Sequence, residues 1–126
     1  MFIIKKINVC NFNTNNVTDM SNMFSGCSLL KKLDLSNFNT NKVIDMSDMF
    51  NGCSSLEEIE LSSFNTNNVN DMRKMFFRCL SLKKVNFSKF NIANVTDMDH
   101  MFGGCNSELG KIAKEQIKNI RESAFL

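Results

Sequence analysis

The sequence predicts a right-handed solenoid of the α/β class, with one short parallel strand and one short helix in each of four 26-residue repeats. Two residue columns carry this prediction, because each recurs every 26 positions without insertion or deletion. They are Phe12, Phe38, Phe64 and Phe90, and Cys27, Cys53, Cys79 and Cys105. A fixed period of about 20 to 50 residues is typical of proteins built from stacked repeats.

The repeats also set the expected domain boundaries. We expect one solenoid domain over residues 1–106, with a partial repeat followed by repeats at 7–32, 33–58, 59–84 and 85–110. The pattern then breaks, because Glu108 stands in the leucine column and Gln116 in the phenylalanine column. Residues 107–126 carry apolar residues at helical spacing, which predicts an amphipathic capping helix that begins near Asn106 or Ser107.

The strand of each repeat is predicted from alternation. In the second repeat, Leu33 and Leu35 flank the polar Asp34, and a period of two is the pattern of a strand with one buried face. A strand of about three or four residues is not stable alone, but strands repeated at a constant offset can pair in parallel.

The helix of each repeat is predicted from a different spacing. After Asp45, apolar residues at i, i+3, i+4 and i+7 place Met46, Met49, Phe50 and Cys53 on one side of a short helix. Asp45 would be its N-cap, as would Asp19, Asp71 and Asp97 in the other repeats. The expected core of the second repeat also includes Leu30, Leu33, Leu35, Phe38 and Val43.

The repeated polar and sulfur-bearing columns are expected to be structural. Cysteines 26 residues apart lack the close pairs typical of zinc sites, so we expect small buried thiols. The aspartate column has no Gly- and Asp-rich loop to complete a calcium site, which favours capping. A third column is expected to form a ladder whose side-chain amides bond the backbone of adjacent coils: Asn13, Asn39, Asn65 and Asn91.

No residue constellation indicates an enzyme or a cofactor. His100 is the only histidine, and no nucleophile or partner can be matched to it. We therefore expect no catalytic, cofactor-binding or metal site. The 15 basic and 13 acidic residues are scattered and give a net charge of +2, which makes nucleic acid an improbable partner.

The first residues bear on assembly and location. The apolar segment Met1–Ile4 is too short to cross a membrane, so membrane insertion is not expected. The segment is also not a recognisable signal peptide. The sequence offers no cap for this end of the solenoid, and the open coil predicts end-to-end self-association.

The repeats resemble a known family. Leu30-x-x-Leu33-x-Leu35 followed by Phe38-Asn39 resembles the leucine-rich-repeat signature LxxLxLxxN, and hence a leucine-rich-repeat-like solenoid. The longer phrase LSNFNTNKVIDMSDMFNGCSSL is similar to the repeat of the BspA-like leucine-rich-repeat surface proteins, over about residues 3–107. This resemblance implies a secreted or cell-surface solenoid that adheres to host proteins or to other cells.

The expected function is a non-catalytic protein-interaction or adhesion module. The partner, a host or cell-surface protein of unknown identity, would contact solvent-facing strand positions that vary between repeats: Asp34, Glu60 and Asn86. One alternative is a structural fragment or degenerate remnant of a longer repeat protein, and a weaker one is a metal-binding repeat protein. Because no signal peptide or anchor is recognised, a cytoplasmic location is an alternative to the surface.

Overall fold

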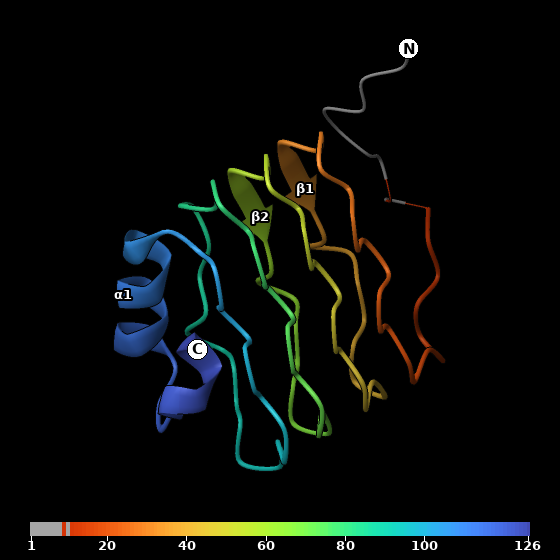
Figure 1. Ribbon diagram of the computed structural model, residues 1–126. Coiled ribbons are helices and arrows are strands. Elements are labelled where there is room, and N and C mark those ends of the chain that lie inside the picture. Colours follow the sequence, from red (N-terminus) through yellow and green to blue (C-terminus); the bar gives the residue numbers. More distant parts are fainter. Residues whose placement is uncertain (1–8, 10) are drawn as a thin grey trace.

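The chain winds into coils that lie side by side along one axis, with the C-terminal helix against the last coil (Figure 1). The computed structural model describes Val9 and residues 11–126. Coils 1 to 4 denote residues 7–32, 33–58, 59–84 and 85–110. The apolar Met1–Ile4, from which an open first coil was expected, lies outside the described residues.

The strands stack at the repeat distance. β1 (Lys32–Asp34) pairs in parallel with β2 (Glu58–Glu60), and Leu33 lies opposite Ile59. Beyond β2 the pairing continues, among the described residues, only as a single bridge from Glu58 to Lys84. Strand partners are therefore 26 residues apart, as the repeat predicts.

The short helix expected after each aspartate is not formed, and this prediction was wrong. Residues 46–53 make consecutive turns, and their alternate N–H groups bond to the following coil. The N–H groups of Met46, Asp48 and Phe50 donate to carbonyls of coil 3 at 3.0, 3.0 and 2.9 Å. Of the intervening N–H groups, those of Met49 and Asn51 donate to carbonyls three residues back, at 3.3 and 3.2 Å. We call the four equivalent segments, 19–27, 45–53, 71–79 and 97–105, the turn wall.

Two residues in each turn-wall segment have a left-handed backbone conformation. In coil 2 these are Asp48, with φ of 57°, and Gly52, with φ of 79°. A right-handed helix cannot contain such residues, so the backbone turns twice within eight residues. Every second N–H group then points to the neighbouring coil, and the turn wall becomes a hydrogen-bonded layer.

The core lies between the strands and the turn wall. All nine residues expected in the core of the second repeat are buried, from Leu30 to Cys53. Phenylalanine rings form a continuous stack along the axis, with centroid distances of 5.7, 5.3 and 5.5 Å between Phe24, Phe50, Phe76 and Phe102. Apolar burial and ring stacking between coils thus stabilise the stack together.

The C-terminal segment covers the last coil with two short helices in place of the single helix expected over residues 107–126. α1 (Ser107–Gln116) begins at its N-cap Asn106, whose side chain accepts a hydrogen bond from the N–H of Leu109 at 2.9 Å. The 3-10 helix η1 (Glu122–Phe125) follows a turn that contains Asn119, with φ of 66°. A left-handed residue at this turn prevents one continuous helix.

The segment after α1 continues the hydrogen bonding of the turn wall. The N–H of His100 donates to the carbonyl of Ser123 at 2.9 Å, and that of Phe102 donates to Ala124 at 2.7 Å. In coils 1 to 3, the same donors bond to the next coil. Residues 123–124 therefore substitute for part of a fifth coil.

Candidate partner-binding face

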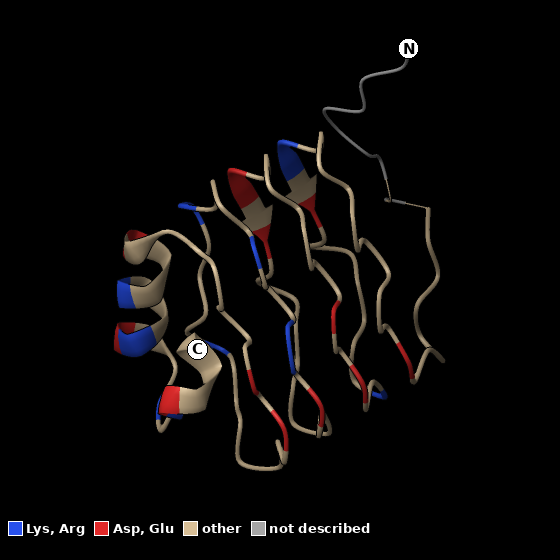
Figure 2. Ribbon diagram, viewed as in Figure 1, with Lys and Arg blue, Asp and Glu red and all other residues tan. Residues whose placement is uncertain are grey.

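The strands form the floor of a shallow groove of about 530 Å³. Its lining consists of three residues at each boundary between consecutive coils: Lys32, Leu33, Asp34, Glu58, Ile59, Glu60, Lys84, Val85 and Asn86. Figure 2 shows charged residues on both β1 and β2. We call these nine residues the strand groove.

The three residues predicted to contact a partner lie together in this groove. Asp34, Glu60 and Asn86 are all exposed. One side-chain oxygen of each accepts a hydrogen bond from the backbone N–H two residues later, at 2.9, 2.9 and 2.8 Å. These side chains therefore also hold the corner where the strand position ends, a role that the sequence analysis did not include.

A second row of the groove alternates in charge. The Glu58 carboxylate lies 3.8 Å from the Lys32 ammonium and 3.3 Å from the Lys84 ammonium. Exposed pairs of this kind contribute at most about 1 kcal/mol each to stability. Three carboxylates (Asp34, Glu58, Glu60) and two ammonium groups (Lys32, Lys84) give the groove a formal charge of −1.

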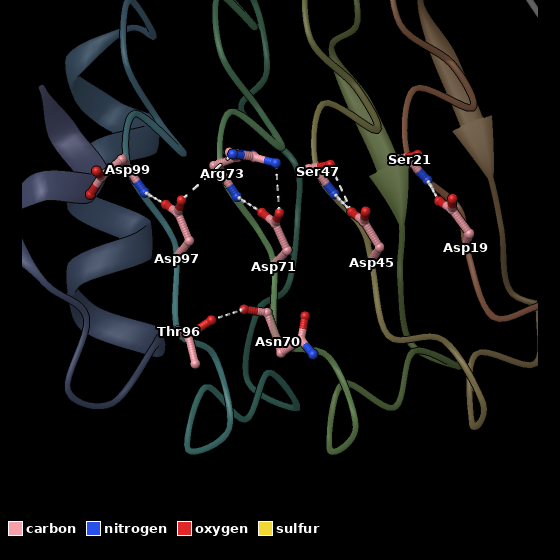
Figure 3. Close-up of polar contacts among 10 residues, drawn as sticks. All are labelled: Asp19, Ser21, Asp45, Ser47, Asn70, Asp71, Arg73, Thr96, Asp97 and Asp99. Carbon is pink, nitrogen blue, oxygen red and sulfur yellow. Dashed lines mark hydrogen bonds and ion pairs between the residues drawn. The ribbon is translucent and has the colours of Figure 1, made fainter.

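The aspartate column forms a row along the turn wall (Figure 3). Asp19 pairs with Asp45, Asp45 with Asp71, and Asp71 with Asp97 through parallel bridges. Each carboxylate accepts a hydrogen bond from the N–H two residues later, at 2.8, 2.8, 3.0 and 3.0 Å. Because no helix follows, the predicted helix-capping role is replaced by closure of a local turn.

The carboxylates in this row have different electrostatic environments. Partial burial raises the pKa of Asp71, and the neighbouring carboxylates of Asp45 and Asp97 raise it further, against the lowering effect of Arg73. The Arg73 guanidinium lies 3.2 Å from Asp71 and 3.9 Å from Asp97. The pKa of Asp19 is lowered instead, by hydrogen bonds from the Ser21 hydroxyl and N–H.

Three members of the cysteine column form a ladder of thiol hydrogen bonds. Cys53 and Cys79 are buried as expected, whereas Cys27 and Cys105 are only partly buried. The thiols of Cys53, Cys79 and Cys105 donate to phenylalanine carbonyls of the preceding coil at 3.1, 3.2 and 2.9 Å. Burial raises the pKa of Cys53 to about 12 and of Cys105 to about 11, and it also raises that of Cys79. These thiols are therefore neutral and unreactive at ordinary pH.

The asparagine column forms an amide ladder, but the expected backbone partners were wrong, because the amides bond side chains of the preceding coil. Asn39 donates from Nδ2 to the Asn15 side chain at 3.2 Å, and Asn65 and Asn91 repeat this contact at 3.1 and 3.0 Å. In each case the acceptor is the side-chain oxygen of an asparagine in the preceding coil. The Asn13 side chain accepts a hydrogen bond from the N–H of Asn15 at 3.0 Å and so holds its own turn.

A buried threonine column was missed by the sequence analysis. The Thr66 hydroxyl donates to the carbonyl of Asn91 at 2.9 Å and accepts from the N–H of the same residue at 2.8 Å. Thr14 and Thr40 make the same reciprocal contacts with the next coil. The sequence contained a signal for this column. Thr14, Thr40 and Thr66 each precede another coil that the hydroxyl can bond, whereas the equivalent residue of the last coil is the apolar Ile92.

Two other features, a metal-binding cluster of side chains and a membrane-spanning helix, are absent from the described residues. Val9 and residues 11–126 contain no cluster of three or more His, Cys, Asp or Glu side chains placed to hold a metal ion. Over the same residues, no helix has the length and apolar character needed to cross a membrane. His100 is exposed, and its Nδ1 lies 3.0 Å from the backbone oxygen of Leu126.

Comparison with known proteins gives one family. No curated protein and no solved structure matches the chain. A family model described as "Mycoplasma protein of unknown function, DUF285" matches residues 2–116, which covers all four coils and α1. The chain belongs to the DUF285 family.

Proposed function

We propose that this chain is a non-catalytic protein-interaction module, built as a leucine-rich-repeat-like, right-handed solenoid. The observation that carries the proposal is the strand groove. It gathers side chains that differ between coils on a scaffold whose buried positions repeat. Repeat proteins bind other proteins through exposed, variable residues that a rigid repeated scaffold holds in place.

The groove's charge suggests the chemistry of its partner. Asp34 and Glu60 form an acidic row, and the groove as a whole has a formal charge of −1 from three carboxylates and two ammonium groups. We infer a protein segment that places basic side chains along this row. The similarity of the repeats to BspA-like surface proteins supports adhesion as the role, and the cell surface or the exterior as the location.

The groove proposal can be tested with a library of random 12-residue peptides displayed on phage. The variant Asp34→Asn with Glu60→Gln removes both charges and retains oxygens that can accept from Ser36 and Ser62. Peptides enriched on the original protein should carry basic residues and bind this variant at least about tenfold more weakly.

The matched control is Asp99→Asn with Glu122→Gln, which removes two exposed carboxylates away from the groove. Enriched peptides should bind this control as they bind the original protein. Equal binding to all three proteins, or enrichment of no peptide, would exclude the groove as the binding surface.

One observation favours a second candidate, a structural role within a longer stack. In coils 2 and 3, turn-wall carbonyls accept N–H groups from the preceding coil. In coil 1, no described residue donates to the equivalent carbonyls of Asp19, Ser21, Met23 and Ser25. A further coil of the same kind would satisfy them. An extra copy of residues 33–58 inserted before residue 7 should therefore raise the free energy of unfolding, and no increase would count against this role.

A further inference from the structure

The turn wall of coil 3 differs in composition from the other three coils. Its segment 71–79 reads DMRKMFFRC, whereas coil 2 has DMSDMFNGC at 45–53. The substitutions bring three cations and an additional phenylalanine to one exposed stretch. We call Lys74, Phe77, Arg78 and the adjacent His100 the cation–aromatic patch.

The patch is organised around one ring. The Lys74 ammonium lies 5.7 Å and the Arg78 guanidinium 5.3 Å from the centroid of the Phe77 ring. The His100 ring meets it edge-on at 6.3 Å, with an interplanar angle of 82°. Attraction to the ring restricts both cations to one surface. Less side-chain conformational entropy is therefore lost when a partner binds.

The next coil leaves room for this arrangement. A Cβ atom on Gly103 would clash with the backbone oxygen of Leu126 and lie 2.9 Å from the Phe77 ring, and one on Gly104 would lie 3.2 Å from Cγ of Arg78. Side chains at these two positions of coil 4 would therefore move Phe77 and shift Arg78 slightly. The cation–aromatic patch thus extends from coil 3 across the backbone of coil 4.

Both cations occupy unfavourable backbone conformations. Lys74 and Arg78 have φ of 54° and 59°, and the residues equivalent to Arg78 are Gly26, Gly52 and Gly104. A left-handed conformation favours glycine, so an arginine there is not explained by folding. Backbone strain of this kind is typical of functional sites.

Lys74 and Arg78 also have no carboxylate partner within the described part of the chain. The ion pairs among the described residues involve Lys32, Arg73 and Lys84, and the guanidinium of Arg73 is already paired with Asp71 and Asp97. Two exposed cations beside an aromatic ring therefore remain available to an anionic partner.

We propose that the cation–aromatic patch is a second binding surface, and that its partner is an acidic segment of another protein. A carboxylate can take two parallel hydrogen bonds from the guanidinium of Arg78, while Lys74 attracts a second acidic side chain. The carboxylates of Asp48 and Asp99 belong to the flanking coils and disfavour a continuous polyphosphate backbone. A protein segment with separated acidic residues fits this charge pattern better than a nucleic acid.

The test is a titration of the full chain with an acetylated hexaglutamate peptide, monitored by ¹H–¹⁵N spectra at a salt concentration of about 0.15 M, where charges are screened over about 8 Å. Shift changes should centre on the amides of Lys74, Phe77 and Arg78. The variant Lys74→Asn with Arg78→Gly gives coil 3 the residues of coil 1, Asn22 and Gly26, and removes the strain at residue 78. It should fold and bind the peptide at least about tenfold more weakly.

The control is Lys31→Asn with Lys83→Asn, which removes two exposed charges from the strand side. Its affinity should stay within about twofold of the original protein, because net charge alone contributes little at this distance. Equal weakening in both variants, or no binding by the original protein, would overturn the proposal. If an oligothymidylate of six nucleotides bound through the same amides more tightly than the hexaglutamate peptide, the proposal would be overturned in favour of a nucleic acid.

Discussion

The ring of Phe125 lies 5.7 Å from that of Phe102, with an interplanar angle of 18°, and it extends the phenylalanine stack of the core by one member. Phe125 belongs to η1, which is outside the repeats, yet it occupies the position that a fifth coil would fill. The C-terminal segment thus covers the last coil with both apolar contacts and backbone acceptors.

Replacement of Phe125 tests this capping role. Phe125→Ala should lower the free energy of unfolding by about 2 kcal/mol, because the partly buried ring covers Phe102. Urea denaturation followed by circular dichroism would measure the change. The control is Leu126→Ala, where the side chain is 72% exposed and the expected change is below about 0.5 kcal/mol. Equal effects of the two substitutions would show that η1 does not cap the stack.

The carboxylate of Asp71 is expected to oppose folding at neutral pH. Its raised pKa means that the folded state binds a proton more readily than the unfolded state, so stability from this group rises as pH falls towards 3.8. Asp71→Asn retains an oxygen for the Arg73 N–H and removes the partly buried charge. We expect a gain of about 0.5 kcal/mol at pH 7 that disappears below pH 4, measured by urea denaturation.

Asp19 provides the comparison for this prediction. The pKa of Asp19 is lowered by the hydrogen bonds from Ser21. The stabilisation of the folded state by this carboxylate is therefore present at neutral pH and is lost as pH falls below 3.8. Asp19→Asn should therefore reduce stability at pH 7 and have no effect in acid. Changes of the same sign in the two variants at pH 7 would contradict the electrostatic account of the aspartate row.

The sequence predicted the stacking but not the path of the turn wall. The columns through Phe38 and Cys53 predict coils 26 residues apart, because residues in register along a stack share one environment. The spacing of Met46, Met49 and Phe50 fits a helix equally well, and one repeat read alone contains no information about bonds to its neighbours. The left-handed residues Asp48 and Gly52 were a signal of turns, since Asp and Gly favour that conformation.

The candidate site, too, could be predicted from the sequence only in part. Asp34, Glu60 and Asn86 could be predicted to share a surface, because strands at a constant offset bring equivalent positions together. Their hydrogen bonds to the backbone could not, since these depend on the local conformation after the strand. The cation–aromatic patch was also missed, because the rings and cations of coil 3 meet only once the turns are known.

The threonine column should contribute strongly to coil stacking. Thr66→Val replaces the buried hydroxyl with a methyl group, which leaves the N–H and carbonyl of Asn91 without their partner. The free energy of unfolding should fall by about 1 to 3 kcal/mol. Thr96→Val is the control, because its hydroxyl is exposed and bonds to the Asn70 carbonyl, which also accepts backbone N–H groups. If both substitutions had the same small effect, the column would not stabilise the stack.

The cysteine ladder should make the folded protein resistant to thiol reagents. Cys10 lies outside the described residues, so the test uses a Cys10→Ser background and alkylation by iodoacetamide at pH 9. A thiol whose pKa is about 12, as for Cys53, is ionised to about one part in a thousand at that pH, and only the thiolate reacts. Mass spectrometry should find Cys53 and Cys79 unmodified in the folded protein and fully modified in urea.

The same ladder predicts how stability changes in alkali. Unfolded thiols ionise near pH 9, while the folded thiols of Cys53 and Cys105 keep their protons until about pH 12 and about pH 11. Since the unfolded state then binds fewer protons, the free energy of unfolding must decrease as pH rises above 9. Cys53→Ala should make this decrease less steep, even though it lowers stability at pH 7 by about 1 kcal/mol through the cavity it leaves. An unchanged slope between pH 9 and 11, or rapid alkylation of Cys53 in the folded protein, would show that these thiols are not held neutral by burial.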